Sequence, residues 1–216
     1  MLNSLEILQP DDWHVHLREG DMLKMVTNFS SRINNRCVVM PNTIEPITDT
    51  NKAIFYKNEI TKASSTNFEP LIPCYLTESL DVENFRMGLQ KNFFFGAKLY
   101  PANATTNSKS GVSNITNIYK LFEILEEEDS PLLIHGEKVS ENIDIFDREK
   151  HFIDDELVKI RDKFPKLRIV LEHVSTEYGV KFIKSNKNIA GSITPHHMLL
   201  TKDDVFKNEE INPHHY

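Results

Sequence analysis

The chain has 216 residues, of which 39% are hydrophobic and 26% are charged, and its formal net charge at pH 7 is −7. This is the composition of a soluble globular protein that can bury a substantial core. The negative charge, without any cluster of Lys and Arg, argues against a nucleic-acid partner. A small anionic substrate remains compatible with it, provided that a local cationic site exists.

Targeting signals and disulfides are not expected from the sequence. The apolar runs are shorter than the roughly 20 residues of a membrane span, so we expect no transmembrane segment. Residues 1–10 lack the basic and apolar regions of a secretory signal, so a cytoplasmic location is the default expectation. Cys37 and Cys74 lie in apolar runs, which predicts reduced, buried thiols.

Short apolar runs alternate with stretches of helical period along nearly the whole chain. One such stretch carries Met22, Val26, Phe29 and Ile33, and its spacing predicts an apolar helix face against a sheet. A second carries Ile115, Ile118, Phe122 and Leu125. The predicted strands are residues 12–18, 37–42, 70–77, 93–100, 131–137, 167–173 and 189–195.

Alternating strands and helices predict a parallel α/β sheet that is covered on both faces. A doubly wound sheet and a (β/α)8 TIM barrel both satisfy this pattern. Polar residues recur at the carboxyl ends of successive strands, which favours the barrel, and the glycine-rich loops of nucleotide-binding sheets are missing from the sequence. No linker divides the sequence, so we expect residues 1–216 to form a single barrel domain with seven of the eight strands.

The first predicted strand carries two histidines. Residues two apart in a strand project from the same face, so His14 and His16 point the same way and Arg18 follows at the rim. An isolated pair of this kind is as often structural as metal-binding. His135 and His173 each end a further apolar strand, and four imidazoles at one barrel mouth favour a metal such as zinc.

The predicted fourth strand contains Lys98 in an otherwise apolar run. A buried ammonium is costly unless it is paired. Lys98 either extends outward past the helices, or its amine reacts with carbon dioxide to form a carbamate that bridges two metal ions.

These residues, in this order along the chain, resemble the binuclear amidohydrolase superfamily. Longer blocks resemble dihydroorotases of the short, stand-alone bacterial type, from about Leu5 to Tyr216. The blocks are residues 10–23 (PDDWHVHLREGDML), 39–42 (VMPN), 97–107 (AKLYPANATTN) and 143–149 (IDIFDRE).

The resemblance implies a cyclic amidohydrolase of pyrimidine synthesis that interconverts dihydroorotate and N-carbamoyl-L-aspartate. It also implies two Zn2+ per subunit, bridged by carboxylated Lys98, and a homodimer. A bridging carbamate, one carboxylate and a hydroxide would leave about +1 on the metal pair. The implied metal ligands are His14, His16, Lys98, His135 and His173, and the implied substrate-binding residues are His16, Leu17, Arg18, Asn42 and His135.

Several neighbouring residues have weaker signals. Glu137 is a candidate to orient a ligand imidazole, whereas Glu172 adjoins His173 in a strand and is expected to point to the opposite face. Asp144 and Asp147 are expected to cap a helix beginning near Arg148. We expect His197 to support the site, and residues 101–113 to form a mobile cover.

The resemblance also implies an aspartate base at the end of an eighth strand, which we expect to lie beyond Tyr216. Asp203 and Asp204 are poor substitutes because they are predicted to open a helix. We therefore expect a chain truncated before that strand, inactive alone and weak in metal binding. Two alternatives remain, a hydantoinase-like amidohydrolase that does not require Arg18 and Asn42, and a non-catalytic barrel that serves as an assembly partner.

Overall fold

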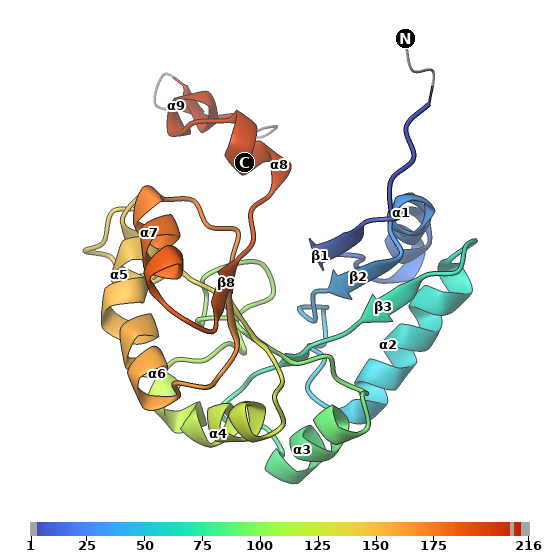
Figure 1. Ribbon diagram of the computed structural model, residues 1–216, viewed down its shortest axis with the longest axis horizontal. Helices are drawn as coiled ribbons and strands as arrows, with labels where there is room; N and C mark the ends of the chain where they lie inside the picture. The colour runs from blue at the N-terminus through green and yellow to red at the C-terminus, as the bar shows by residue number, and fades with distance from the viewer. Residues whose placement is uncertain (1–3, 208–209, 213–216) are drawn as a thin grey trace.

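The structure, a computed structural model, describes residues 4–207 and 210–212. Strands of a parallel sheet line the inside and helices cover the outside, as the alternating sequence pattern predicts (Figure 1). Each strand pairs in parallel with its neighbour in the chain, from β1 to β3 and from β4 to β8. The strands are β1 Asp11–Val15, β2 Arg36–Val39, β3 Glu69–Leu71, β4 Cys74–Tyr75, β5 Ala97–Leu99, β6 Leu132–His135, β7 Ile169–Glu172 and β8 Ile189–Gly191.

The predicted strands are all present, but several are shorter than predicted. The strand predicted at 70–77 is divided into β3 and β4 at Pro73, which has no N–H to donate to a ladder. The strand predicted at 93–100 begins only at Ala97, because Phe93 and Phe94 donate their N–H groups to Gly88 O and close the end of the preceding helix.

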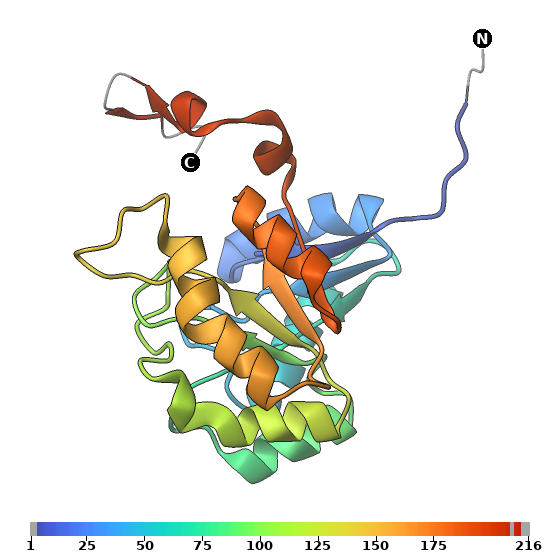
Figure 2. The same ribbon diagram turned by 60° about the vertical axis from the view of Figure 1, so that its left-hand side comes forward.

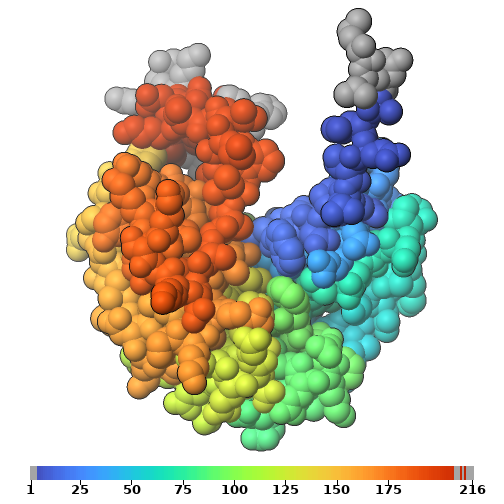
Figure 3. All heavy atoms as spheres, in the orientation of Figure 1, coloured from blue at the N-terminus to red at the C-terminus, as the bar shows by residue number. Residues whose placement is uncertain are grey.

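The helices lie outside the strands, and the ring is open between β1 and β8 (Figure 1). The space-filling view is hollowed between the N-terminal and C-terminal segments (Figure 3). The helices are α1 Gly20–Ile33, α2 Thr50–Ala63, α3 Val82–Gln90, α4 Tyr119–Glu127, α5 Arg148–Phe152, α6 Val158–Lys163, α7 Glu177–Ser185, α8 Pro195–Leu199 and α9 Lys202–Val205. A 3-10 turn, Ile115–Ile118, precedes α4, a π-helical turn, Ile153–Leu157, joins α5 to α6, and β9 Phe206–Lys207 pairs antiparallel with β10 Glu210–Ile211.

The orientation predicted for α1 is wrong. Met22, Phe29 and Ile33 are more than half exposed, and of the predicted stripe Val26 alone packs partly against the core. The buried residues of α1 are Leu23, Thr27 and Ser31. The sequence of α1 contains an apolar stripe, but nothing in it says which side of the helix the sheet occupies. By contrast, Ile115, Ile118, Phe122 and Leu125 are buried in the main core, as predicted.

Cys37 and Cys74 are free and buried, which confirms the prediction of reduced thiols. Within the part of the chain that the structure describes, no helix combines the length and the apolar character that a membrane crossing requires.

Candidate metal centre

The four predicted histidines come together at the carboxyl ends of β1, β6 and β7. They form two close pairs: His14 Nε2 lies 3.2 Å from His16 Nε2, and His135 Nδ1 lies 3.0 Å from His173 Nε2. The ring centroids of His14 and His173 are 5.5 Å apart, so the two pairs adjoin each other. The prediction that separate strand ends would converge is therefore supported by the geometry.

Two local backbone features direct these imidazoles inward. The pairing of β1 with β2 shifts register between Asp12 and Val15, and Asp12 Oδ1 accepts a hydrogen bond from His14 N at 3.0 Å. At the end of β7, His173 has a φ of 43°, in the left-handed region that residues other than glycine rarely adopt. This turn breaks the alternation of the strand, so that Glu172 and His173 both reach the site.

The prediction that Glu172 points away from the site is wrong. Its side chain is fully buried and forms an ion pair with Lys98, and it accepts a hydrogen bond from His14 Nδ1 at 2.9 Å. Lys98 is itself 0% exposed, so its side chain does not extend outward past the helices. The barrel interior thus holds a lysine, a glutamate and four imidazoles in mutual contact.

Burial favours the neutral form of three of the four histidines, His16, His135 and His173. Burial lowers the pKa of His16 to about 3 and that of His173 to about 2, and it also lowers the pKa of His135 against the opposing effect of Glu137. Burial lowers the pKa of Lys98 as well, although Glu172 acts in the opposite direction. Burial alone would raise the pKa of Glu172, but Lys98 and His14 outweigh it and lower the pKa to about 2.

The donor atoms suit metal ions, although they do not surround one. Among the described residues, no three His, Cys, Asp or Glu side chains are grouped around a single point. Instead, the imidazoles form two adjoining pairs, one of which contacts Glu172 through His14. Neutral imidazole nitrogen is a preferred ligand of zinc, and a bridging group is what two adjacent ions require. The donor set is therefore chemically suited to metal ions such as zinc.

The predicted substrate-binding residues lie beside this site in different ways. The charge of Arg18 is close enough to contribute to the lowered pKa of His16, although burial and His14 contribute more. Its backbone is also left-handed, with a φ of 61°, and its carbonyl accepts a hydrogen bond from Tyr56 OH at 2.8 Å. The Leu17 side chain is fully buried in the core, so only its backbone is available to a ligand.

Asn42 is buried and connects β2 to the loop at residues 101–113. Its Nδ2 donates to Thr106 O at 2.9 Å, and Asn107 Nδ2 donates to Asn42 O at 3.1 Å. Asn42 Oδ1 is buried without a hydrogen-bond partner among the described residues. The loop is thus anchored at Asn42, and its role as a cover stays a prediction.

A cavity of about 590 Å³ opens beside His135 and His173. His197, predicted to support the site, lines this cavity with His196, and its Nδ1 lies 2.7 Å from Thr194 Oγ1. His196 was not predicted to belong to the site. Its only available signal was its place beside His197 after the β8 segment.

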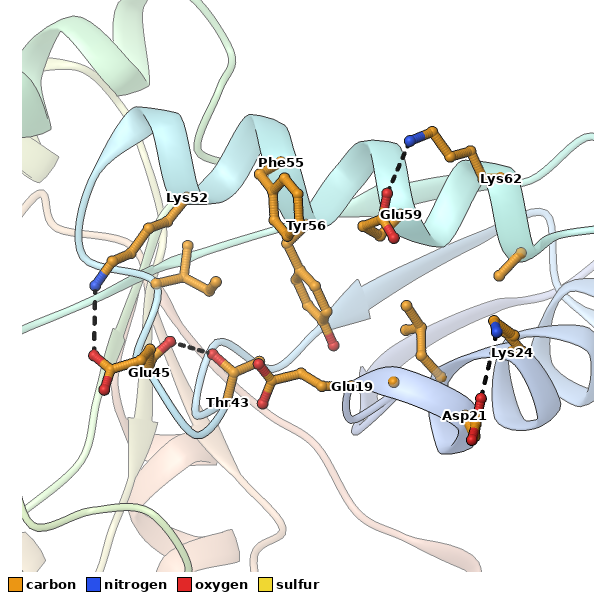
Figure 4. Close-up of a pocket in the computed structure, with 14 residues that line it drawn as sticks. Glu19, Asp21, Lys24, Thr43, Glu45, Lys52, Phe55, Tyr56, Glu59 and Lys62 are labelled. Carbon is orange, nitrogen blue, oxygen red and sulfur yellow. Dashed lines mark hydrogen bonds and ion pairs between the residues drawn. The ribbon is translucent and has the colours of Figure 1, made fainter.

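A larger cavity, of about 800 Å³, lies between α1 and α2 (Figure 4). The lysines that line it form ion pairs with neighbouring carboxylates: Lys62 Nζ lies 2.9 Å from Glu59 Oε1, and Lys24 Nζ lies 3.3 Å from Asp21 Oδ1. Lys52 and Glu45 form a third, longer pair at 4.0 Å. The cavity contains none of the histidines, so its size does not make it the reactive site.

The helix-capping predictions are partly confirmed. Helix α5 begins at Arg148 with Asp147 at the N-cap, but the Asp147 side chain makes no capping hydrogen bond in the described structure. Asp144 Oδ1 instead accepts from Phe146 N at 2.9 Å, one turn earlier. Asp203 and Asp204 lie in the first turn of α9, as predicted.

The parallel strands, with histidines and a buried lysine at their ends, define a TIM barrel of the amidohydrolase class. The L-hydantoinase (dihydropyrimidinase) of Arthrobacter aurescens has this fold, with a TM-score of 0.72 over 95% of this chain and 51% of that chain. Its sequence is only 14% identical, so this likeness concerns the fold alone.

Sequences and structures of higher identity belong to dihydroorotases. The enzyme of Buchnera aphidicola subsp. Schizaphis graminum is 46% identical over 219 residues, covering 100% of this chain and 62% of that protein. The crystal structure from Campylobacter jejuni is 36% identical with a TM-score of 0.87, and covers 95% of this chain and 60% of that chain. The structure from Saccharomyces cerevisiae, in complex with 5-fluoroorotic acid, is 34% identical with a TM-score of 0.85, and covers 92% and 59%.

The chain therefore spans about 60% of the length of these relatives. No family model matches it. Its predicted resemblance to dihydroorotases is confirmed over nearly its whole length.

Proposed function

We propose that this chain carries the metal and substrate residues of a zinc-dependent cyclic amidohydrolase that interconverts dihydroorotate and N-carbamoyl-L-aspartate in pyrimidine synthesis. The observation that supports this most directly is Lys98, fully buried in the barrel interior beside Glu172 and four converging imidazoles. A lysine buried for structural reasons needs a carboxylate partner, which Glu172 supplies, but it does not need four imidazoles around it. The names of the similar proteins supply the substrate class.

In this proposal His14 and His16 would hold one zinc ion, His135 and His173 would hold the other, and carboxylated Lys98 would be a ligand shared by both. When bound, zinc lowers the pKa of water and polarises a carbonyl. The protein's part is to keep the imidazoles neutral by burial and to fix their orientation through Glu172 and Glu137.

Carboxylation of Lys98 follows from its surroundings. A neutral amine attacks carbon dioxide, a C–N bond forms, and one proton leaves, giving a carbamate with one negative charge. Burial lowers the pKa of Lys98 and so favours the neutral amine that this step requires. The carbamate would then offset the charge of the two cations, whereas an unmodified ammonium would add to it.

Arg18 and Asn42 are proposed to hold the substrate carboxylate. The guanidinium of Arg18 offers a planar pair of donors for it. Asn42 has one Nδ2 hydrogen engaged with Thr106 O, which leaves the second for a ligand. The yeast relative was solved with 5-fluoroorotic acid, an acidic ligand in keeping with this assignment. The imidazoles of His16 and His135 and the backbone of Leu17 complete the proposed substrate site. A homodimer and a cytoplasmic location belong to the same proposal.

The test is the metal content and the state of Lys98. The chain is prepared with zinc and bicarbonate, and zinc is measured together with the intact native mass. We expect two zinc ions and the added mass of one carbon dioxide, both lost in Lys98→Met, with Lys150→Met as the matched control on α5. A chain that binds no zinc and carries an unmodified Lys98 contradicts the proposal.

Substrate class is tested separately with the chain joined to the remaining length of the Buchnera relative. Hydrolysis of dihydroorotate but not of an uncharged hydantoin supports the carboxylate site at Arg18. The reverse preference favours a hydantoinase-like enzyme. If Arg18→Met keeps its activity on dihydroorotate and on the hydantoin, Arg18 does not belong to the substrate site. Size-exclusion chromatography tests the homodimer.

A further inference from the structure

The sequence block at residues 143–149 ends in Arg148 and Glu149, and neither residue has a role in the proposed function. Both lie at the first turn of α5, which packs beside α7 outside β6 and β7 (Figure 2). Adjacent residues on a helix point in different directions, and these two reach different strand ends. Arg148 contacts the end of β6, and Glu149 contacts the loop that follows β7.

Arg148 is connected to His135 through one carboxylate. Its Nη1 donates to Glu137 Oε1 at 3.1 Å, and Glu137 Oε2 lies 3.0 Å from His135 Nε2. The backbone is tied at the same place, because Lys138 N donates to Arg148 O at 3.1 Å. When Nε2 carries the proton and donates it to Glu137, the lone pair of His135 Nδ1 is directed toward His173, 3.0 Å away.

Glu149 holds the segment that follows His173. Its carboxylate accepts hydrogen bonds from Ser175 N at 2.8 Å and from Thr176 N at 3.2 Å, and a further one from Thr176 Oγ1 at 2.5 Å. These donors lie immediately before α7, whose N-cap is Thr176. The carboxylate therefore accepts hydrogen bonds at the N-terminal end of the helix, where backbone N–H groups have no partner within the helix. The approach is close: a Cβ at Gly179 would stand 2.4 Å from Glu149 Oε1, which explains a glycine there.

The left-handed backbone at His173 makes this anchoring important. His173 lies between β7 and the Glu149-bound segment, and Ser175 Oγ donates to His173 O at 3.1 Å. A residue with a φ of 43° is held in that conformation by its surroundings rather than by its own preference. Glu149 supplies that constraint on the carboxyl side of His173.

We propose that Arg148 and Glu149 are positioning residues that fix His135 and His173 as one pair, the pair assigned to the second zinc ion. This inference rests on the proposed function for the identity of the metal, but the positioning itself is a property of the chain. His14 has different partners, since its ring contacts Glu172 and its backbone N–H donates to Asp12. The two proposed zinc sites therefore have different supporting residues. Substitutions in the first turn of α5 should affect the site of His135 and His173 and not that of His14 and His16.

The test compares Arg148→Gln and Glu149→Gln with two controls. Glu177→Gln removes a carboxylate from the first turn of α7, where Glu177 pairs with exposed Lys181 at 2.7 Å. Lys150→Gln removes a cation that is next to Glu149 in the sequence and pairs with Asp154. Zinc binding is measured by competition with a chelator, resolving two affinities. In the metal-free chain, nitrogen-15 NMR of histidine reports the tautomer of His135 and the exchange of its Nε2 proton.

We expect both test variants to weaken one zinc ion by roughly 10- to 100-fold and to leave the other unchanged, the loss typical of a removed outer partner of a ligand. In the metal-free chain, we expect Arg148→Gln to speed exchange of the His135 Nε2 proton and Glu149→Gln to shift the His173 resonances. The controls should match the wild type in both measurements. Wild-type affinities together with unchanged NMR spectra in both test variants would overturn the inference.

The two proposals fail in distinguishable ways. If the wild-type chain binds no zinc, the proposed function fails, whereas the NMR comparison still decides whether Arg148 and Glu149 position the imidazoles. If zinc binds to the wild type and both sites weaken equally in each test variant, the pair-specific role is wrong. Circular dichroism of each variant shows whether it is folded. If Glu149→Gln unfolds, it is replaced by Glu149→Asp, which keeps the negative charge on a shorter side chain.

Discussion

Lys98 and Glu172 form an ion pair inside the barrel in which neither side chain is exposed to solvent. The carboxylate also accepts a hydrogen bond from His14, so one buried group contacts both a metal-ligand candidate and the lysine proposed to carry the bridging carbamate. In the metal-free chain, the pair keeps each charge compensated.

Removing one partner of this pair leaves a buried charge unpaired. We expect Glu172→Gln to lower the free energy of unfolding of the metal-free chain by about 3–5 kcal/mol. The double change Lys98→Met with Glu172→Gln should recover much of this loss, because no buried charge then remains. Urea unfolding followed by circular dichroism measures both. Glu177→Gln, which breaks an exposed pair that solvent screens, should have a much smaller effect. A cost for Glu172→Gln as small as that of this control contradicts the prediction.

The buried histidines make the metal-free chain sensitive to acid. Folding lowers the pKa of His16 from 6.5 to about 3 and that of His173 to about 2, so below pH 6.5 the unfolded chain binds protons that the folded chain does not. Stability must therefore fall as the pH falls from 6.5, by about 1.4 kcal/mol per pH unit for each histidine. Together they predict a slope of roughly 2.7 kcal/mol per pH unit between pH 6 and pH 4.

Glu172 extends this loss to lower pH. Its folded pKa of about 2 lies below its ordinary value of 4.5, so its contribution is complete above pH 4.5 and disappears as the pH falls toward 2. Unfolding free energies measured by urea at several pH values test both effects. Replacing His173 with Gln should flatten the slope above pH 4.5 by about half, and an unchanged slope means that His173 is already protonated in the folded chain.

The thiols should be unreactive in the folded chain. Burial raises the pKa of Cys37 to about 12 and that of Cys74 well above its ordinary value, and the thiolate is the reactive form. We expect no reaction with an aromatic disulfide reagent at pH 8 in native buffer, and reaction of both cysteines in denaturant. Rapid labelling of either thiol in the native chain would show that its strand opens locally.

Much of the site was predictable because it follows from strand geometry. His14 and His16 are two residues apart, and His135 and His173 end apolar strands, so parallel strands must bring them to one end of the barrel. Lys98 was recognisable as a charge in an apolar strand. These inferences require only the period of a strand and the cost of burying a charge.

The role of Glu172 was not predictable in the same way. Strict alternation places it opposite His173, and only the left-handed backbone at His173 brings both to the interior. Sequence gives no clear signal for such a conformation at a histidine. The orientation of α1 failed for a related reason, because its exposed apolar stripe is as periodic as a buried one, and its buried face carries Thr27 and Ser31.

The anchoring of the 101–113 loop at Asn42 leads to a last prediction. Asn42 Nδ2 donates to Thr106 O, and an aspartate at this position has no hydrogen to donate and repels that carbonyl. We expect Asn42→Asp to increase amide hydrogen exchange at residues 103–108 and to weaken binding of orotate, since it removes a donor and adds a negative charge near the proposed carboxylate site.

Hydrogen exchange read by mass spectrometry and orotate titration of the zinc-loaded chain measure the two effects. Asn28→Asp, on α1 and outside these contacts, is the matched control. If exchange in the loop rises while orotate affinity stays unchanged, Asn42 anchors the loop but does not bind the carboxylate.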